Sequence, residues 1–184
     1  LGQAALLARD FDKAIAYAEQ ADAIGQGYPA AQMLKGMALY DRAQLFPFRE
    51  RPIPPEQLAT ACITVSGVEH ADVDLDAAIA STDAAIAVLV QALAQAPPND
   101  ISTLRHRIEQ MLGNAYRLRG QWRFNEHDLA AEMGEAAIAA ARYEQAQAEF
   151  DLAERHYRAA LEGFPVATQP VYHAWTLVGL GTLD

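Results

Sequence analysis

The chain has 184 residues, of which 52% are hydrophobic, 21% charged and only 8% aromatic, and alanine makes up roughly a fifth of it. This composition predicts an all-α fold with closely packed helices and argues against a sheet-based one. A net charge of −10 argues against a nucleic-acid binder, and the single cysteine, Cys62, excludes an intrachain disulfide and a cysteine-rich zinc site.

Residues 1–45 predict a first helical hairpin and a following helix. Phe11 opens a stripe of small residues at helical spacing, namely Ala14, Ala18 and Ala21. Two glycines, Gly2 and Gly36, lie in the flanking helical segments. Because glycine has no side chain, we expect a second helix to cross closely at each of them.

Residues 46–75 form a proline-containing insertion, in which Pro47, Pro52, Pro54 and Pro55 indicate an extended or turning segment. A short helix is expected from Glu56 to about Ile63, with Cys62 as a small buried residue. The aspartates at 72, 74 and 76 resemble a calcium loop, but Ala77 replaces its glycine and Asp83 its final glutamate. We therefore interpret them as caps of the next helix.

Residues 76–165 predict long helical hairpins. A first helix should end near Ala96, before Pro97. Helical patterning then runs from Ile101 to about Arg119 and resumes from Asp128 to about Gln147, with Gly134 as a weak point. Phe150 opens a further helical pattern that ends at Pro165. Residues 166–184, with Trp175 before Val178-Gly179, are expected to start another, truncated repeat.

Two segments carry a repeat signature: Leu112-Gly113-x-x-Tyr116, and Ala153 with Tyr157, Ala160 and Pro165. In this they resemble the tetratricopeptide repeat (TPR) family. The resemblance implies antiparallel helical hairpins stacked as a right-handed α-solenoid with a concave binding surface. The spacing departs from the family. Gly2 and Ala14 are 12 residues apart, whereas Gly36 and Ala85 are 49 apart and Gly113 and Ala153 are 40 apart. The repeats are therefore either interrupted or separated by extra helices.

No pattern of catalytic or metal-ligating residues is present. The five histidines form neither a zinc-protease nor a di-iron spacing, and no phosphate-binding glycine loop or nucleophile motif occurs. We predict a non-enzyme with no cofactor and no metal. No run of about 18 uninterrupted apolar residues and no signal peptide is found, so we expect a cytoplasmic protein without membrane association. The apolar ends suggest a domain fragment of a larger protein.

The candidate partner-binding residues lie on two helical faces. Arg107, Asn114 and Arg117 share one face, and the TPR resemblance implies that Asn114 binds a peptide backbone while the arginines anchor an acidic segment. The alternative is a solvated face that pairs with carboxylates of the same chain. Met33, Met37 and Tyr40 form an apolar stripe, which indicates either a groove or ordinary core.

Three functions fit these observations. The first is a scaffold that binds a partner protein or peptide, with self-association through open repeat ends as a further property. The second is the regulatory arm of a multidomain enzyme or signalling ATPase, by analogy alone. The third is a small-ligand-binding helical bundle in which Met33, Met37 and Tyr40 line a pocket.

Overall fold

The structure is a computed structural model that describes all residues except 26, 45–48, 53–67, 72–74, 99–102 and 184. The described chain is built of helices, which confirms the predicted all-α class, with one short pair of strands besides. The elements are α1 Gly2–Leu7, α2 Phe11–Gly25, α3 Pro29–Ala43, β1 Arg49–Pro52, β2 Val68–Ala71, α4 Leu75–Gln95, α5 Leu104–Glu132, α6 Ala136–Glu162 and α7 Pro170–Gly181.

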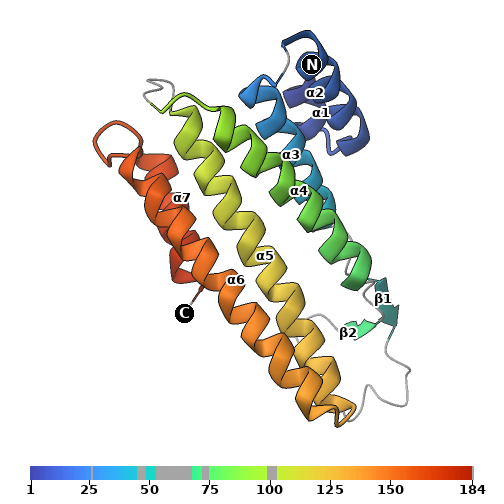
Figure 1. Ribbon diagram of the computed structural model, residues 1–184. Helices are drawn as coiled ribbons and strands as arrows, with labels where there is room; N and C mark the ends of the chain where they lie inside the picture. Colours follow the sequence, from blue (N-terminus) through green and yellow to red (C-terminus); the bar gives the residue numbers. More distant parts are fainter. Residues whose placement is uncertain (26, 45–48, 53–67, 72–74, 99–102, 184) are drawn as a thin grey trace.

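Successive helices lie side by side in chain order, from α1 and α2 at one edge to α6 and α7 at the other (Figure 1). Each helix packs on the next one, and each odd-numbered helix also contacts the next odd-numbered helix. The main core lies among α3, α4 and α5, where Leu89, Ile108 and Leu112 are fully buried. Apolar residues at three- and four-residue spacing therefore place one face of each of these three helices in this core.

Glycines mark the closest helix crossings, as the sequence predicted. A β-carbon built on Gly36 would lie 2.6 Å from the Leu89 side chain of α4. One built on Gly113 would lie 2.6 Å from the ring of Tyr157 on α6, and Gly179 of α7 faces the same ring. Gly2 meets the side chain of Leu34 in the same way. A larger residue at any of these positions would require a side chain of the neighbouring helix to move.

The long hairpin differs from the sequence prediction in where it turns. Helix α5 continues without a break through Gly120 and the expected gap before Asp128, and the turn falls at Gly134. Gly134 has φ +76°, a left-handed conformation that suits glycine after a helix end. Helix α6 begins at Ala136, well before Phe150, because the alanine-rich segment between them is itself helical.

The insertion contributes a small antiparallel ladder that sequence reasoning did not predict. Arg49 of β1 pairs with Ala71 of β2, and Pro52 pairs with Val68. Proline is tolerated there because a two-stranded ladder consists only of edge strands. The expected helix from Glu56, Cys62, Asp72 and Asp74 lie outside the described residues. Asp76 lies within the first turn of α4 and not at the position before it.

Helix α4 is the one helix of the described chain that is long and apolar enough, by length and composition alone, to cross a membrane. It packs between α3 and α5, and its residues Ile79, Ile86 and Leu89 are buried in the core. A buried core helix has this same composition, so the apolar sequence of α4 is accounted for by its position.

Candidate functional site

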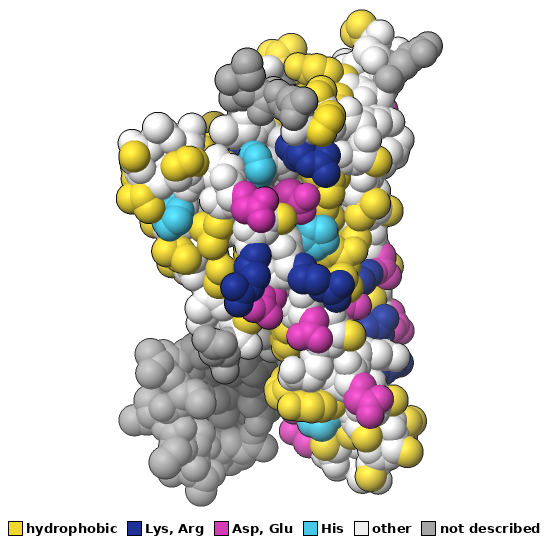
Figure 2. All heavy atoms as spheres, turned by 60° about the vertical axis from the view of Figure 1, so that its left-hand side comes forward, with side chains coloured by type: hydrophobic (Ala, Val, Ile, Leu, Met, Phe, Trp, Pro, Cys, Tyr) yellow, Lys and Arg dark blue, Asp and Glu magenta, His cyan; other side chains and the backbone are white. Residues whose placement is uncertain are grey.

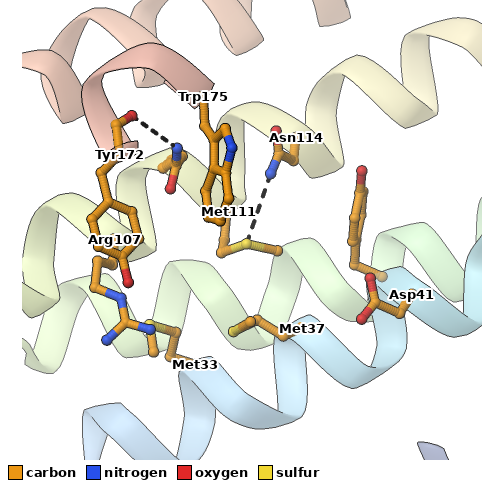
Figure 3. A pocket seen from close by; sticks show the side chains of 10 residues that line it. Met33, Met37, Asp41, Arg107, Met111, Asn114, Tyr172 and Trp175 are labelled. Carbon is orange, nitrogen blue, oxygen red and sulfur yellow. Dashed lines mark hydrogen bonds between the residues drawn. The ribbon is translucent and has the colours of Figure 1, made fainter. Parts of the chain in front are cut away.

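Three helices that are not consecutive in the chain line an open pocket of about 340 Å³ (Figure 3). Helices α3, α5 and α7 each present residues spaced three or four apart, which is the repeat of a single helical face. The labelled residue numbers rise in the same direction along all three helices in Figure 3, so the three run parallel. The lining residues are Met33, Met37, Tyr40, Asp41, Arg107, Gln110, Met111, Asn114, Tyr172 and Trp175.

The middle of the pocket is apolar. Met37 and Met111 lie opposite the indole of Trp175, and Met33 lies nearer one end (Figure 3). Trp175 is 61% exposed, although tryptophan is a residue that folding usually covers. Unbranched methionine side chains adapt their shape to whatever they contact. The pocket therefore offers an adaptable apolar surface that is open to solvent.

A buried hydrogen bond fixes α7 against α5 beside the pocket. The amide nitrogen of Gln110 donates to the hydroxyl of Thr176 over 2.9 Å, and that hydroxyl donates to the carbonyl of Tyr172 over 2.7 Å. Thr176 is completely buried. The wall that carries Tyr172 and Trp175 is thus held in place by polar contacts whose loss would leave buried groups unpaired.

Opposite charges stand at the two ends of the pocket. The Arg107 guanidinium lies 5.5 Å from the centre of the Tyr172 ring, in cation–π contact, and has no carboxylate partner within the described chain. Asp41 lies at the opposite end, beyond Met37 (Figure 3). Burial raises the pKa of Asp41, and the nearby charge of Arg9 lowers it.

Asn114 is oriented by a buried tyrosine. The Tyr157 hydroxyl donates to the Asn114 side-chain oxygen over 2.7 Å, and the Asn114 amide nitrogen has only a weak contact, 3.8 Å long, with the Met111 sulfur. Burial raises the pKa of Tyr157 to about 12, against a lowering effect of Arg117, so its hydroxyl stays protonated and remains a donor at neutral pH. The amide N–H of Asn114 is thereby left to donate into the pocket.

The other arginines of α5 are already engaged. Arg119 bridges Asp83 of α4 and Glu149 of α6, and Arg123 pairs with Glu126. On the face seen in Figure 2, basic side chains lie next to acidic ones instead of forming a patch of one sign. Pairing with carboxylates of the same chain therefore accounts for these two arginines, but not for Arg107.

Five of the six residues singled out from the sequence line this one pocket: Met33, Met37, Tyr40, Arg107 and Asn114. Arg117, the sixth, does not line it and instead interacts with the phenol groups of Tyr40 and Tyr157. Sequence reasoning missed Asp41, Gln110, Met111, Tyr172 and Trp175 as site residues. Met111 and Gln110 share the α5 face of Arg107 and Asn114, so helical periodicity held that signal. The part played by α7 depends on tertiary packing and had no local signal.

The described histidines contact other parts of the fold. His106, His127 and His173 each place a ring nitrogen within 3.2 Å of a backbone carbonyl, and His156 lies 2.6 Å from a carboxylate oxygen of Glu109. No group of three or more metal-ligating side chains occurs among the residues that the structure describes.

Comparisons with known proteins do not assign the chain. No protein-family model matches it, and neither a curated protein nor a solved structure shows significant similarity to it.

Proposed function

We propose that this chain is a protein–protein interaction module, a TPR-like right-handed stack of helical hairpins that binds a partner polypeptide between α3, α5 and α7. The observation that carries the proposal is the pocket itself. It is open, it is lined by three parallel helices from successive hairpins, and it contains an exposed tryptophan. Aromatic residues of this kind are typical anchors of protein interfaces.

The order of helix contacts supports the solenoid arrangement. Contacts join α1 to α3, α3 to α5 and α5 to α7, whereas the described parts of α2, α4 and α6 do not contact one another. In a curved stack of hairpins, the first helices of successive hairpins approach each other on the inner side and the second helices spread apart on the outer side. The pocket is then part of the concave surface.

The lengths of the hairpins fit this arrangement once the insertions are placed. Residues 44–74 lie between α3 and α4, which pack directly on each other, and the excess in the next hairpin lies in the length of α5 and α6. Only the short turn at residues 133–135 separates α5 from α6. The irregular spacing of that hairpin is therefore explained by longer helices and not by an extra one.

The module works by binding alone, without a cofactor or a reaction, in this proposal. A regulatory arm of a larger enzyme or ATPase would use the same groove, so that alternative differs in context and not in contacts. A small-ligand site is less well supported because Trp175 lies open to solvent and not within an enclosed cavity.

Selection from a displayed library of random peptides tests the proposal. Peptides selected on the wild-type protein should lose at least about tenfold in affinity for Trp175→Ala, as interface hot spots do. Val178→Ala is the matched control because Val178 is equally exposed on α7, at 65%, and does not line the pocket. Failure to select any binder, or binders that do not distinguish Trp175→Ala from Val178→Ala, would refute the proposal.

A further inference from the structure

We propose that the pocket recognises an extended peptide segment with a large apolar side chain at its centre. An acidic residue lies two positions away on one side of that centre, and a basic or amide-bearing residue lies two positions away on the other side. This inference rests on the proposed function and adds the chemical class of the partner to it. It is carried by three features of the pocket: Arg107, which has no carboxylate partner among the described residues, the methionines facing Trp175, and Asp41 at the opposite end.

The length of the pocket sets the spacing. Arg107 and Asn114 are seven residues apart on α5, which corresponds to about 10.5 Å along the helix axis. Met33 and Asp41, eight residues apart on α3, span about 12 Å. An extended chain advances about 3.3 Å per residue, so the pocket accommodates roughly four steps of peptide. Residues at alternate positions of an extended chain point to the same side. Three side chains, at the first, third and fifth positions, therefore face the pocket together.

The chemistry of the pocket assigns those three positions. Arg107 is held over the Tyr172 ring, and no carboxylate of the described residues pairs with it, although carboxylates outnumber lysines and arginines by 24 to 14 in this chain. A peptide carboxylate would supply the missing partner through a charge-assisted hydrogen bond. The middle position meets Met37, Met111 and Trp175 and takes an apolar side chain. The last position meets Asp41, whose carboxylate favours a cation or a hydrogen-bond donor.

Asn114 provides the contact to the backbone. Its side-chain oxygen already accepts the hydrogen bond from Tyr157, so its amide N–H points to an acceptor, which in an extended peptide is a backbone carbonyl. This contact is independent of peptide sequence. Sequence preference is then left to the two charges and the apolar centre, and it is these that an experiment must separate.

Fluorescence anisotropy with four labelled peptides makes the separation. Both termini of each peptide are blocked, and each has the sequence Ser-x-Ser-Leu-Ser-y-Ser. The four peptides carry at x and y, in that order, Glu and Lys, Glu and Glu, Lys and Lys, or Gln and Gln. A fifth peptide replaces the central leucine of the Glu and Lys form by glycine. We expect the Glu and Lys peptide to bind at least about fivefold more tightly than the other charge combinations and the glycine form.

Two charge variants test each end by itself. Arg107→Glu should shift the preference to the Lys and Lys peptide, and Asp41→Asn should abolish the discrimination against the Glu and Glu peptide. Arg155→Glu is the matched control for the loss of positive charge, because Arg155 is exposed on α6 and donates only to the Asp151 carbonyl. It should leave the ranking of the peptides unchanged.

The outcomes distinguish this inference from the proposed function. If library selections yield Trp175-dependent binders in which flanking charges are absent, or if Arg107→Glu leaves the ranking unchanged, the inference is wrong and the interaction module remains. If no peptide of either experiment binds, both are overturned.

Discussion

Tyr157 is the point where α5, α6 and α7 meet, and replacing Gly113 by alanine tests that packing. The ring is completely buried, and both Gly113 of α5 and Gly179 of α7 lie directly against it. An added β-carbon at position 113 would lie 2.6, 2.7 and 2.9 Å from three ring carbons. The ring cannot withdraw without disturbing α7 or breaking its hydrogen bond to Asn114.

The expected magnitude is the balance of two effects. Glycine to alanine inside a helix normally stabilises by about 1 kcal/mol. Overpacking of a filled core costs about 1 to 3 kcal/mol, and the hydrogen bond to Asn114 contributes about 1 kcal/mol more if it breaks. Because we expect the displaced ring to lose this hydrogen bond, Gly113→Ala should lower the free energy of unfolding by about 1 to 3 kcal/mol, measured by urea denaturation followed by circular dichroism.

Two further variants make this prediction specific. Gly181→Ala is the matched control, since a β-carbon there would meet nothing within 4 Å, and it should be neutral or slightly stabilising. In a Tyr157→Leu background the ring is gone, and Gly113→Ala should then become neutral or stabilising as well. If Gly113→Ala behaves like Gly181→Ala in the wild-type background, the close crossing of α5 and α6 is wrong.

Three other predictions concern charge and exposed surface. Because the folded-state pKa of Tyr157 is about 12 against an ordinary 10.0, its stabilising effect is present below pH 10 and is lost as the pH rises from 10 to 12. Urea denaturation should show that wild type loses about 1.4 kcal/mol more than Tyr157→Phe between pH 8 and pH 11. Arg119→Met should cost about 1 to 3 kcal/mol in thermal or urea unfolding, since it leaves the mostly buried Glu149 without its cation. Arg158→Met, which removes an exposed pair within one helix, should cost no more than about 0.5 kcal/mol. Val178 belongs to an apolar face of α7 that is open to solvent, and Val178→Asp should reduce concentration-dependent association in light scattering.

Each of the three has a result that would contradict it. A parallel pH dependence of wild type and Tyr157→Phe would mean that the phenol is not held in its neutral form by burial. Equal costs for Arg119→Met and Arg158→Met would show that the bridge between α4 and α6 adds nothing beyond a surface pair. Monodisperse wild-type protein at all concentrations would remove the basis for self-association through α7.

The sequence contained most of the local structure of this fold. Alanine and glycine spacing predicted the helices and the close crossings at Gly2 and Gly36, because these positions depend on the size of one residue and the period of a helix. The turn of the long hairpin was misplaced, since Gly120 and Gly134 look alike in sequence. Only Gly134 adopts a positive φ, whereas Gly120 lies in mid-helix against the Phe150 ring.

The site residues on α3 and those on α5 could each be predicted from the sequence, but not that the two sets lie together in one pocket. Arg107 and Asn114 share a face by periodicity, and so do Met33 and Met37. That these two faces meet, and that α7 completes the pocket with Trp175, depends on packing between helices that are far apart in the chain. Likewise, the arginines of α5 look equivalent in sequence. Only the structure separates Arg119, which bridges two carboxylates, from Arg107, which pairs with no carboxylate in the part of the chain that is described.

The methionines offer the most direct test of the central claim that this groove binds a polypeptide. The chain has four, of which Met33, Met37 and Met111 line the pocket and Met133 lies exposed near the far end of α5. Carbon-13 labelled methionine methyl groups give one NMR signal each, and a selected peptide can be titrated against all four at once. We predict that the three pocket signals shift along a common saturating curve while the Met133 signal stays in place. Unchanged pocket signals, or a shift confined to Met133, at peptide concentrations that saturate binding would contradict the account.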